Sequence, residues 1–195
     1  LPGFAGIAVH DRYQNYFHPG WKRLAGHQVC TAHLLRDFTD AAECYPDQDW
    51  PEQAQRALRG LIHASNQARD AGHAAIASAV RDPLIDSFRH AVRVGLSKVR
   101  PNPGPRSRTA QPPGRTLLEF CRDHEPDVLR FTTDTRIWPT NNISERGLRE
   151  GLGTVELGTA ELRGGGEVRR RRGAVRECEA GRRRIGRRGR ILSPA

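Results

Sequence analysis

The stretch AGIAVHDRYQNY, residues 5–16, decides the fold of the N-terminal part of this chain. A short apolar run over residues 4–10 ends at Asp11, as a buried strand does when it brings an acidic side chain to its C-terminal edge. The letters RYQNYFHPGW, residues 12–21, then predict a short helix or turn that proline and glycine close. We therefore expect a buried strand followed by a compact turn.

A second strand and a helix follow. GHQVC, residues 26–30, predicts another short strand. TAHLLRDFTDAAE, residues 31–43, has apolar residues at helical spacing, with Thr31 as the expected N-cap. The order strand, helix, strand, helix favours an α/β sheet with parallel neighbours.

The rest of the chain has a different character. Apolar positions at i, i+3 and i+4 spacing predict two or three antiparallel helices within residues 46–134, interrupted by a flexible basic loop at residues 100–114. A further helix is expected over residues 115–134. NNISERGLR, residues 141–149, predicts a helix with polar side chains on one face. Residues 151–195 are rich in arginine and glycine without a sustained apolar period, so we expect a disordered tail.

Composition and charge narrow the function classes. The 195 residues suffice for one domain with an insertion or a tail, and the formal net charge of +10 favours a polyanionic partner such as nucleic acid. No apolar stretch has the length of a membrane span, so no membrane partner is expected. The four cysteines form no C-x-x-C pair, which disfavours a zinc cage. Because methionine is absent, we expect the chain to begin partway through a longer protein.

Three segments together resemble one family: AGIAVHDRYQNY, then HQVCTAHLLRDF, and finally NNISERGLR. They look like the transposase of the insertion sequence sixty-six family, and the resemblance covers roughly residues 1–149. It implies a ribonuclease-H-like fold, so the expected fold class is α/β: a partial ribonuclease-H-like fold with a mainly helical insertion and, from the composition, a disordered Arg/Gly-rich C-terminal tail. The expected divisions are a core segment at residues 1–45, the insertion at 46–134, a helix at 135–150 and the tail at 151–195.

The resemblance also implies a metal site of the DDE type. Asp11 matches the second acidic ligand of the family and Glu145 matches the third. Two divalent ions, Mg²⁺ or Mn²⁺, are expected in the complete protein, because one activates the attacking oxygen and the other stabilises the leaving oxygen. The first acidic ligand of the family lies on an earlier strand, and no acidic residue precedes Asp11 here. We therefore expect the site to be incomplete in this chain.

Several polar residues are candidates for DNA contact. Arg146 and Arg149, with Asn142 and its neighbour Asn141, could position the metal-bearing helix and touch a DNA phosphate, because arginine offers a bidentate fork to phosphate oxygens. Helix capping and solvated charge explain the same residues equally well. Arg36 either faces the DNA or forms a salt bridge with Asp37 or Asp40.

Two further features near Asp11 have alternative explanations. His33 lies three residues after Cys30, and with no second pair at suitable spacing a packing or hydrogen-bonding histidine is favoured over a zinc ligand. Tyr13 and Tyr16 either stack on a base or pack under the sheet edge, and packing is favoured.

The family resemblance stops abruptly near Arg149. We interpret the switch to arginine and glycine as a shift of the reading frame, which would make the tail an accident of coding. The functional alternative is a disordered arm, rich in arginine and glycine, that binds nucleic acid.

The predicted function is DNA transposition, with the chain as a fragment of a DDE transposase that cleaves and joins DNA strands at insertion-sequence ends. The fragment is expected to be inactive alone. The resemblance implies DNA as partner, a possible homo-oligomer on DNA, and a cytoplasmic, nucleoid-associated location in a bacterium. The alternatives are a non-catalytic basic DNA- or RNA-binding protein, and a pseudogene product without present function.

Overall fold

The computed structural model describes residues 5–21, 23–105 and 110–141 of the chain. Its sheet consists of β1 (Ile7–His10) and β2 (Gly26–Val29), which pair in parallel with Ile7 opposite Gly26 and His10 opposite Val29. Two short 3₁₀ helices, η1 (Gln14–Phe17) and η2 (Pro19–Trp21), lie between the strands. The expected strand, turn and parallel strand are therefore confirmed, although β1 begins three residues later than the apolar run.

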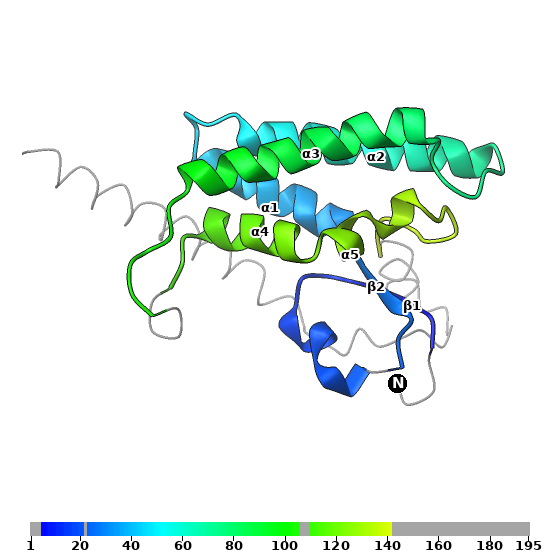
Figure 1. The fold of residues 1–195 in the computed structure, drawn as a ribbon, viewed down its shortest axis with the longest axis horizontal. Helices are drawn as coiled ribbons and strands as arrows, with labels where there is room; N and C mark the ends of the chain where they lie inside the picture. The colour runs from blue at the N-terminus through cyan, green and yellow to red at the C-terminus, as the bar shows by residue number, and fades with distance from the viewer. Residues whose placement is uncertain (1–4, 22, 106–109, 142–195) are drawn as a thin grey trace, which may run out of the picture.

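Most of the described residues are helical. Figure 1 shows α2 (Trp50–Asp70) and α3 (Ser78–Lys98) side by side in one layer, with α1 (Thr31–Cys44) and α4 (Pro113–Asp123) in a second layer beneath them. The strands lie beside the start of α1. The fold is thus mixed α/β, with a small sheet attached to a larger helical body, whereas the ribonuclease-H-like assignment remains a prediction.

The turn between α2 and α3 explains why the two helices are antiparallel. Gly72 has a φ of +72°, the left-handed conformation that glycine adopts without steric cost. His73 N–H donates to the Ala68 carbonyl at 2.8 Å, and Gly72 N–H donates to the Arg69 carbonyl at 2.9 Å. These two bonds form a Schellman motif, which ends α2 and turns the chain back.

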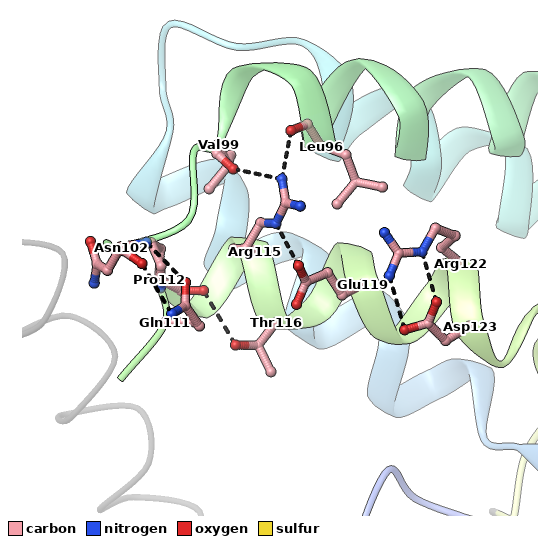
Figure 2. Close-up of polar contacts among 10 residues, drawn as sticks. All are labelled: Leu96, Val99, Asn102, Gln111, Pro112, Arg115, Thr116, Glu119, Arg122 and Asp123. Atoms are coloured by element: carbon pink, nitrogen blue, oxygen red, sulfur yellow. Dashed lines mark hydrogen bonds and ion pairs between the residues drawn. The ribbon is translucent and has the colours of Figure 1, made fainter. Parts of the chain in front are cut away.

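The loop between α3 and α4 is fastened at its base (Figure 2). The guanidinium of Arg115 donates through Nη1 to the Leu96 carbonyl at 2.7 Å and the Val99 carbonyl at 3.2 Å, and through Nε to Glu119 at 2.7 Å. Arg115 therefore satisfies carbonyls at the end of α3 that have no partner within the helix. Asn102 N–H donates to the side-chain oxygen of Gln111 at 2.9 Å, which closes the loop. Because α4 begins at Pro113, the loop is slightly shorter than expected.

Two local expectations were wrong. The helix expected over residues 115–134 is divided into α4, α5 (Glu125–Leu129) and the 3₁₀ helix η3 (Arg130–Thr132). The break falls at His124, because Pro126 has no N–H to continue the hydrogen-bonding pattern of α4.

The N-cap of α1 is Cys30, not Thr31. Thr31 is the first helical residue, and its hydroxyl donates to the Pro139 carbonyl at 2.9 Å, far along the chain. A contact with a distant segment thus replaces the local cap that the sequence predicts.

One apolar core runs through both parts of the molecule. It includes Val29 of β2 and Leu34 of α1, both fully buried, together with residues of α2, α3, α4 and η3. The close approach of the layers depends on Gly95 in α3, where an added Cβ would lie 2.7 Å from Leu118 and 2.9 Å from Trp50.

The segment after α5 returns along α2 toward the start of α1. Arg69 donates through Nε to the Thr135 carbonyl at 2.7 Å, and its guanidinium lies 4.0 Å from the centroid of the Trp138 ring. These contacts guide the chain to Pro139, next to the N-terminus of α1. None of the helices among the described residues is both long and apolar enough to cross a membrane. The predicted tail at 151–195 lies outside the described residues.

Candidate functional site

Asp11 follows β1 directly and lies at the C-terminal edge of the parallel sheet, as the sequence predicts. Its Oδ1 accepts a hydrogen bond of 2.9 Å from the Tyr13 backbone N–H, which tightens the turn after the strand. The carboxylate borders a pocket of about 510 Å³ between this turn and α1. The residues lining the pocket are Asp11, Arg12, Tyr13, Gln14, Asn15, His33 and Asp37.

Helix α1 supplies the other wall of the pocket through His33 and Asp37. These residues are four positions apart and therefore lie on the same face of the helix. Asp37 Oδ2 accepts a hydrogen bond of 2.8 Å from Arg12 Nε, which ties the turn after β1 to α1. Both side chains are partly exposed, so the pair contributes little to stability and mainly sets the geometry of the pocket.

Cys30 and His33 form a coupled pair at the start of α1. The Cys30 thiol is fully buried and donates to Asn141 Oδ1 at 3.0 Å. Burial by itself raises the pKa of Cys30, but hydrogen bonding to His33 and Asn141 outweighs it, and the net pKa is lowered. The same interaction with Cys30 raises the pKa of His33 against the opposing effect of burial, and the nearby Asp11 charge adds to the rise.

The three sequence segments that carry the family resemblance meet at this point. The Cys30 N–H donates to the His10 carbonyl at 2.7 Å, which joins the end of β1 to the start of α1. The Thr31 N–H donates to the Pro139 carbonyl at 2.8 Å, and Asn141 follows two residues later. Segments that are more than a hundred residues apart are therefore in contact beside the Asp11 pocket.

The two tyrosines have different surroundings. Tyr16 is half-buried and stacks on His10 with ring centroids 4.4 Å apart, which fits the expected packing beneath the sheet edge. Tyr13 is 42% exposed at the pocket and does not join the core. Packing is therefore confirmed for Tyr16 and wrong for Tyr13.

The remaining candidates are only partly covered. Glu145, Arg146, Arg149 and Asn142 lie outside the described residues. Arg36 is half-buried on α1, and its charge acts on His33. Of its two expected salt-bridge partners, Asp37 pairs with Arg12.

The potential metal ligands of the described residues do not form a cluster. Residues 5–21, 23–105 and 110–141 contain no group of three or more His, Cys, Asp or Glu side chains able to hold a metal ion. Within these ranges Asp11 and Asp37 line the pocket, and neither belongs to such a group.

Sequence reasoning missed two contacts that shape the pocket. The pairing of Arg12 with Asp37 spans 25 positions, and that of Cys30 with Asn141 spans 111. The sequence did offer one signal for the pocket wall: His33 and Asp37 are four positions apart on a predicted helix and therefore share a face.

Comparison with known proteins identifies the family of this chain. The family described as "Transposase IS66 family" matches residues 1–153, which is most of the chain. The chain belongs to this transposase family, and the resemblance seen in the sequence is confirmed. No curated protein and no solved structure matches the chain. Membership connects the chain with transposition, with DNA as the partner of the family, and with divalent metal use in general.

Proposed function

We propose that the chain carries part of the catalytic site of a DDE transposase, which cleaves DNA strands and transfers them at insertion-sequence ends with Mg²⁺ or Mn²⁺. Asp11 and Glu145 are the proposed metal ligands. The observation that carries the proposal is the position of Asp11, at the C-terminal edge of a parallel sheet and in a pocket where the three family segments meet. Ligands of α/β proteins characteristically bind at this edge.

The position of Asn141 supports the role of Glu145. Asn141 contacts Cys30 at the start of α1, and Glu145 follows four residues later. Four residues span at most roughly 14 Å, so the chain is short enough to keep Glu145 in the neighbourhood of the pocket. The contact between Asn141 and Cys30 therefore supports a site to which Asp11 and Glu145 both contribute.

The chemistry of Asp11 fits a hard divalent cation. One carboxylate oxygen is engaged by the Tyr13 N–H, which orients the group, and carboxylate oxygens are preferred by Mg²⁺ and Mn²⁺. When bound, two such ions lower the barrier to phosphodiester cleavage by stabilising the attacking and leaving oxygens. The first acidic ligand implied by the family is not assigned to a residue of this chain.

The DNA contacts proposed from the sequence complement the metal ligands. Arg36 of α1, together with Asn142, Arg146 and Arg149, would bind phosphate oxygens on either side of the reacting bond. In this proposal residues 1–45 belong to a ribonuclease-H-like core, residues 46–134 are its helical insertion, and several copies assemble on paired DNA ends.

Substitution of the proposed ligands tests this function in a complete transposase that contains this chain. Asp11→Asn and Glu145→Gln should each reduce metal-dependent strand cleavage by about a thousand-fold, because a ligand worth several kcal/mol in the transition state is lost. Glu52→Gln on α2, which also removes one exposed carboxylate, is the matched control and should cleave normally.

The alternative function, a non-catalytic basic nucleic-acid-binding protein, gives the opposite result. It requires DNA binding that is indifferent to Mg²⁺ and to both substitutions. Normal cleavage by Asp11→Asn in the complete protein would sink the catalytic proposal.

A further inference from the structure

The proposed metal site leaves the role of His33 open. Its side chain lines the pocket together with Asp11. Among the described residues, His33 Nδ1 is the single buried side-chain nitrogen or oxygen atom without a geometrically defined hydrogen-bond partner. A buried polar atom of this kind is costly, so its retention calls for a physical reason.

The surroundings of the ring define which nitrogen can meet a ligand. Nδ1 is buried in the protein, and His33 is coupled to Cys30 at the start of the same helix. Because the ring borders the pocket while Nδ1 is shielded from it, Nε2 is the nitrogen left to face the pocket. The Cys30 thiol donates a hydrogen bond to Asn141 Oδ1, so the residue coupled to His33 is itself held in place.

Two features of His33 favour an anionic ligand. His33 is the third residue of α1, a helix of 14 residues, and lies near its N-terminus, where the helix dipole places a partial positive charge. Interactions with Cys30 and Asp11 favour the protonated imidazole. Arg12 at the same pocket is already engaged by Asp37, whereas His33 lines the pocket together with the proposed ligand Asp11.

We propose that His33 is a DNA-binding residue of the Asp11 pocket, where its Nε2–H donates a hydrogen bond to a nonbridging oxygen of a DNA phosphodiester. The inference rests on the proposed function, because it takes DNA as the occupant of the pocket. Cys30 acts behind the ring as a positioning residue. His33 thereby holds the backbone of the strand beside the metal-binding carboxylate without itself binding metal.

Amide substitutions can distinguish the two ring nitrogens. The glutamine amide in His33→Gln places an N–H near the position of Nε2, whereas the asparagine amide in His33→Asn places one near Nδ1. His33→Ala removes both donors. His63 of α2 is exposed and remote in sequence, so His63→Ala is the matched control.

The experiment measures the affinity of the full chain for a short fluorescein-labelled DNA duplex by fluorescence anisotropy, with Mg²⁺ and with EDTA. His33→Ala and His33→Asn should bind about ten-fold more weakly, as expected for loss of one charge-assisted hydrogen bond. His33→Gln should bind within about two-fold of the parent chain, and His63→Ala should bind normally. Thermal melting followed by circular dichroism should show similar midpoints for all variants.

Two results would overturn the inference. Unchanged affinity in all three His33 variants would show that no DNA contact is made there. Retained binding by His33→Asn together with weak binding and a lowered melting midpoint in His33→Gln would assign the histidine to packing through Nδ1.

The proposed function is tested separately. If the parent chain binds DNA and Asp11→Asn removes the effect of Mg²⁺ while the His33 variants are normal, only the inference about His33 fails. If the parent chain does not bind DNA, the inference about His33 fails, whereas the proposed function is decided by strand cleavage in the complete transposase.

Discussion

The pocket end of the molecule and its helical body stabilise their side chains in different ways, and two buried cysteines show the difference. Cys30 lies at the pocket, where His33 and Asn141 overcome the effect of burial and lower the pKa of the thiol. Cys121 lies in α4, where burial among apolar residues raises the pKa of its thiol to about 12. Both thiols are free. Polar partners at one end and apolar packing at the other thus shift the pKa of the same residue type in opposite directions.

This contrast has a consequence for substitutions. The helical body holds the large buried side chains of α2, α3 and α4, so its substitutions should act on the free energy of unfolding. The pocket end presents partly exposed polar groups, so its substitutions should act on binding and catalysis and leave stability nearly unchanged.

The largest stability effect is expected at Leu58, a fully buried residue of α2. Leu58→Ala should lower the free energy of unfolding by about 2–5 kcal/mol, because it removes apolar contacts and leaves a cavity. Urea unfolding followed by circular dichroism measures this. Val80→Ala at a half-exposed site of α3 is the control and should have little effect, as should Asp11→Asn. Strong destabilisation by Asp11→Asn would remove the distinction between the two regions.

A smaller loss is expected at Gly95, where α3 approaches its neighbours most closely. The added Cβ of Gly95→Ala would lie 2.7 Å from Leu118 and 2.9 Å from Trp50, so these core side chains must shift, at about 1–3 kcal/mol. Gly60→Ala is the matched control, because its Cβ would meet only the flexible end of Leu84 at 3.0 Å. Similar urea midpoints for the two variants would contradict the close packing at Gly95.

The two thiols should differ in reactivity. Alkylation by iodoacetamide requires the thiolate, so Cys30 should react before Cys121 at neutral pH even though both need local opening. Peptide mapping by mass spectrometry gives the rate at each cysteine. His33→Gln should slow the reaction at Cys30 and leave Cys121 unchanged. Equal rates at Cys30 in the parent chain and in His33→Gln would show that His33 does not act on the thiol.

The smallest effect is the pH dependence from His33. Its pKa in the folded chain is raised above 6.5 by Cys30, so protonation stabilises the fold. This contribution is fully present below the unfolded value of 6.5 and is lost as the pH rises through the raised folded value. The urea midpoint of the parent chain relative to His33→Gln should therefore fall as the pH increases across this window. A difference that grows with pH would reverse the assigned direction.

The elements with the strongest local patterns could be predicted from the sequence. The apolar residues of α2 recur at helical spacing, a short apolar run leads through β1, and Asp11 stands at a strand end in the sequence as in the structure. The break at His124 and the cap at Cys30 differ from the sequence prediction. At His124 the following Pro126 outweighs local helix propensity, and at the start of α1 the hydroxyl of Thr31 bonds the distant Pro139 carbonyl.

The amino-acid sequence by itself determined the family, the parallel strand order, the main helices and the candidate role of Asp11. Only the tertiary structure decided that Arg12 pairs with Asp37, that Asn141 contacts Cys30, and that His33 borders the Asp11 pocket. The physical reason is the distance in sequence between the residues that interact. Periodicity and capping are properties of neighbouring residues, whereas a pocket is made by side chains that folding brings together across more than a hundred positions.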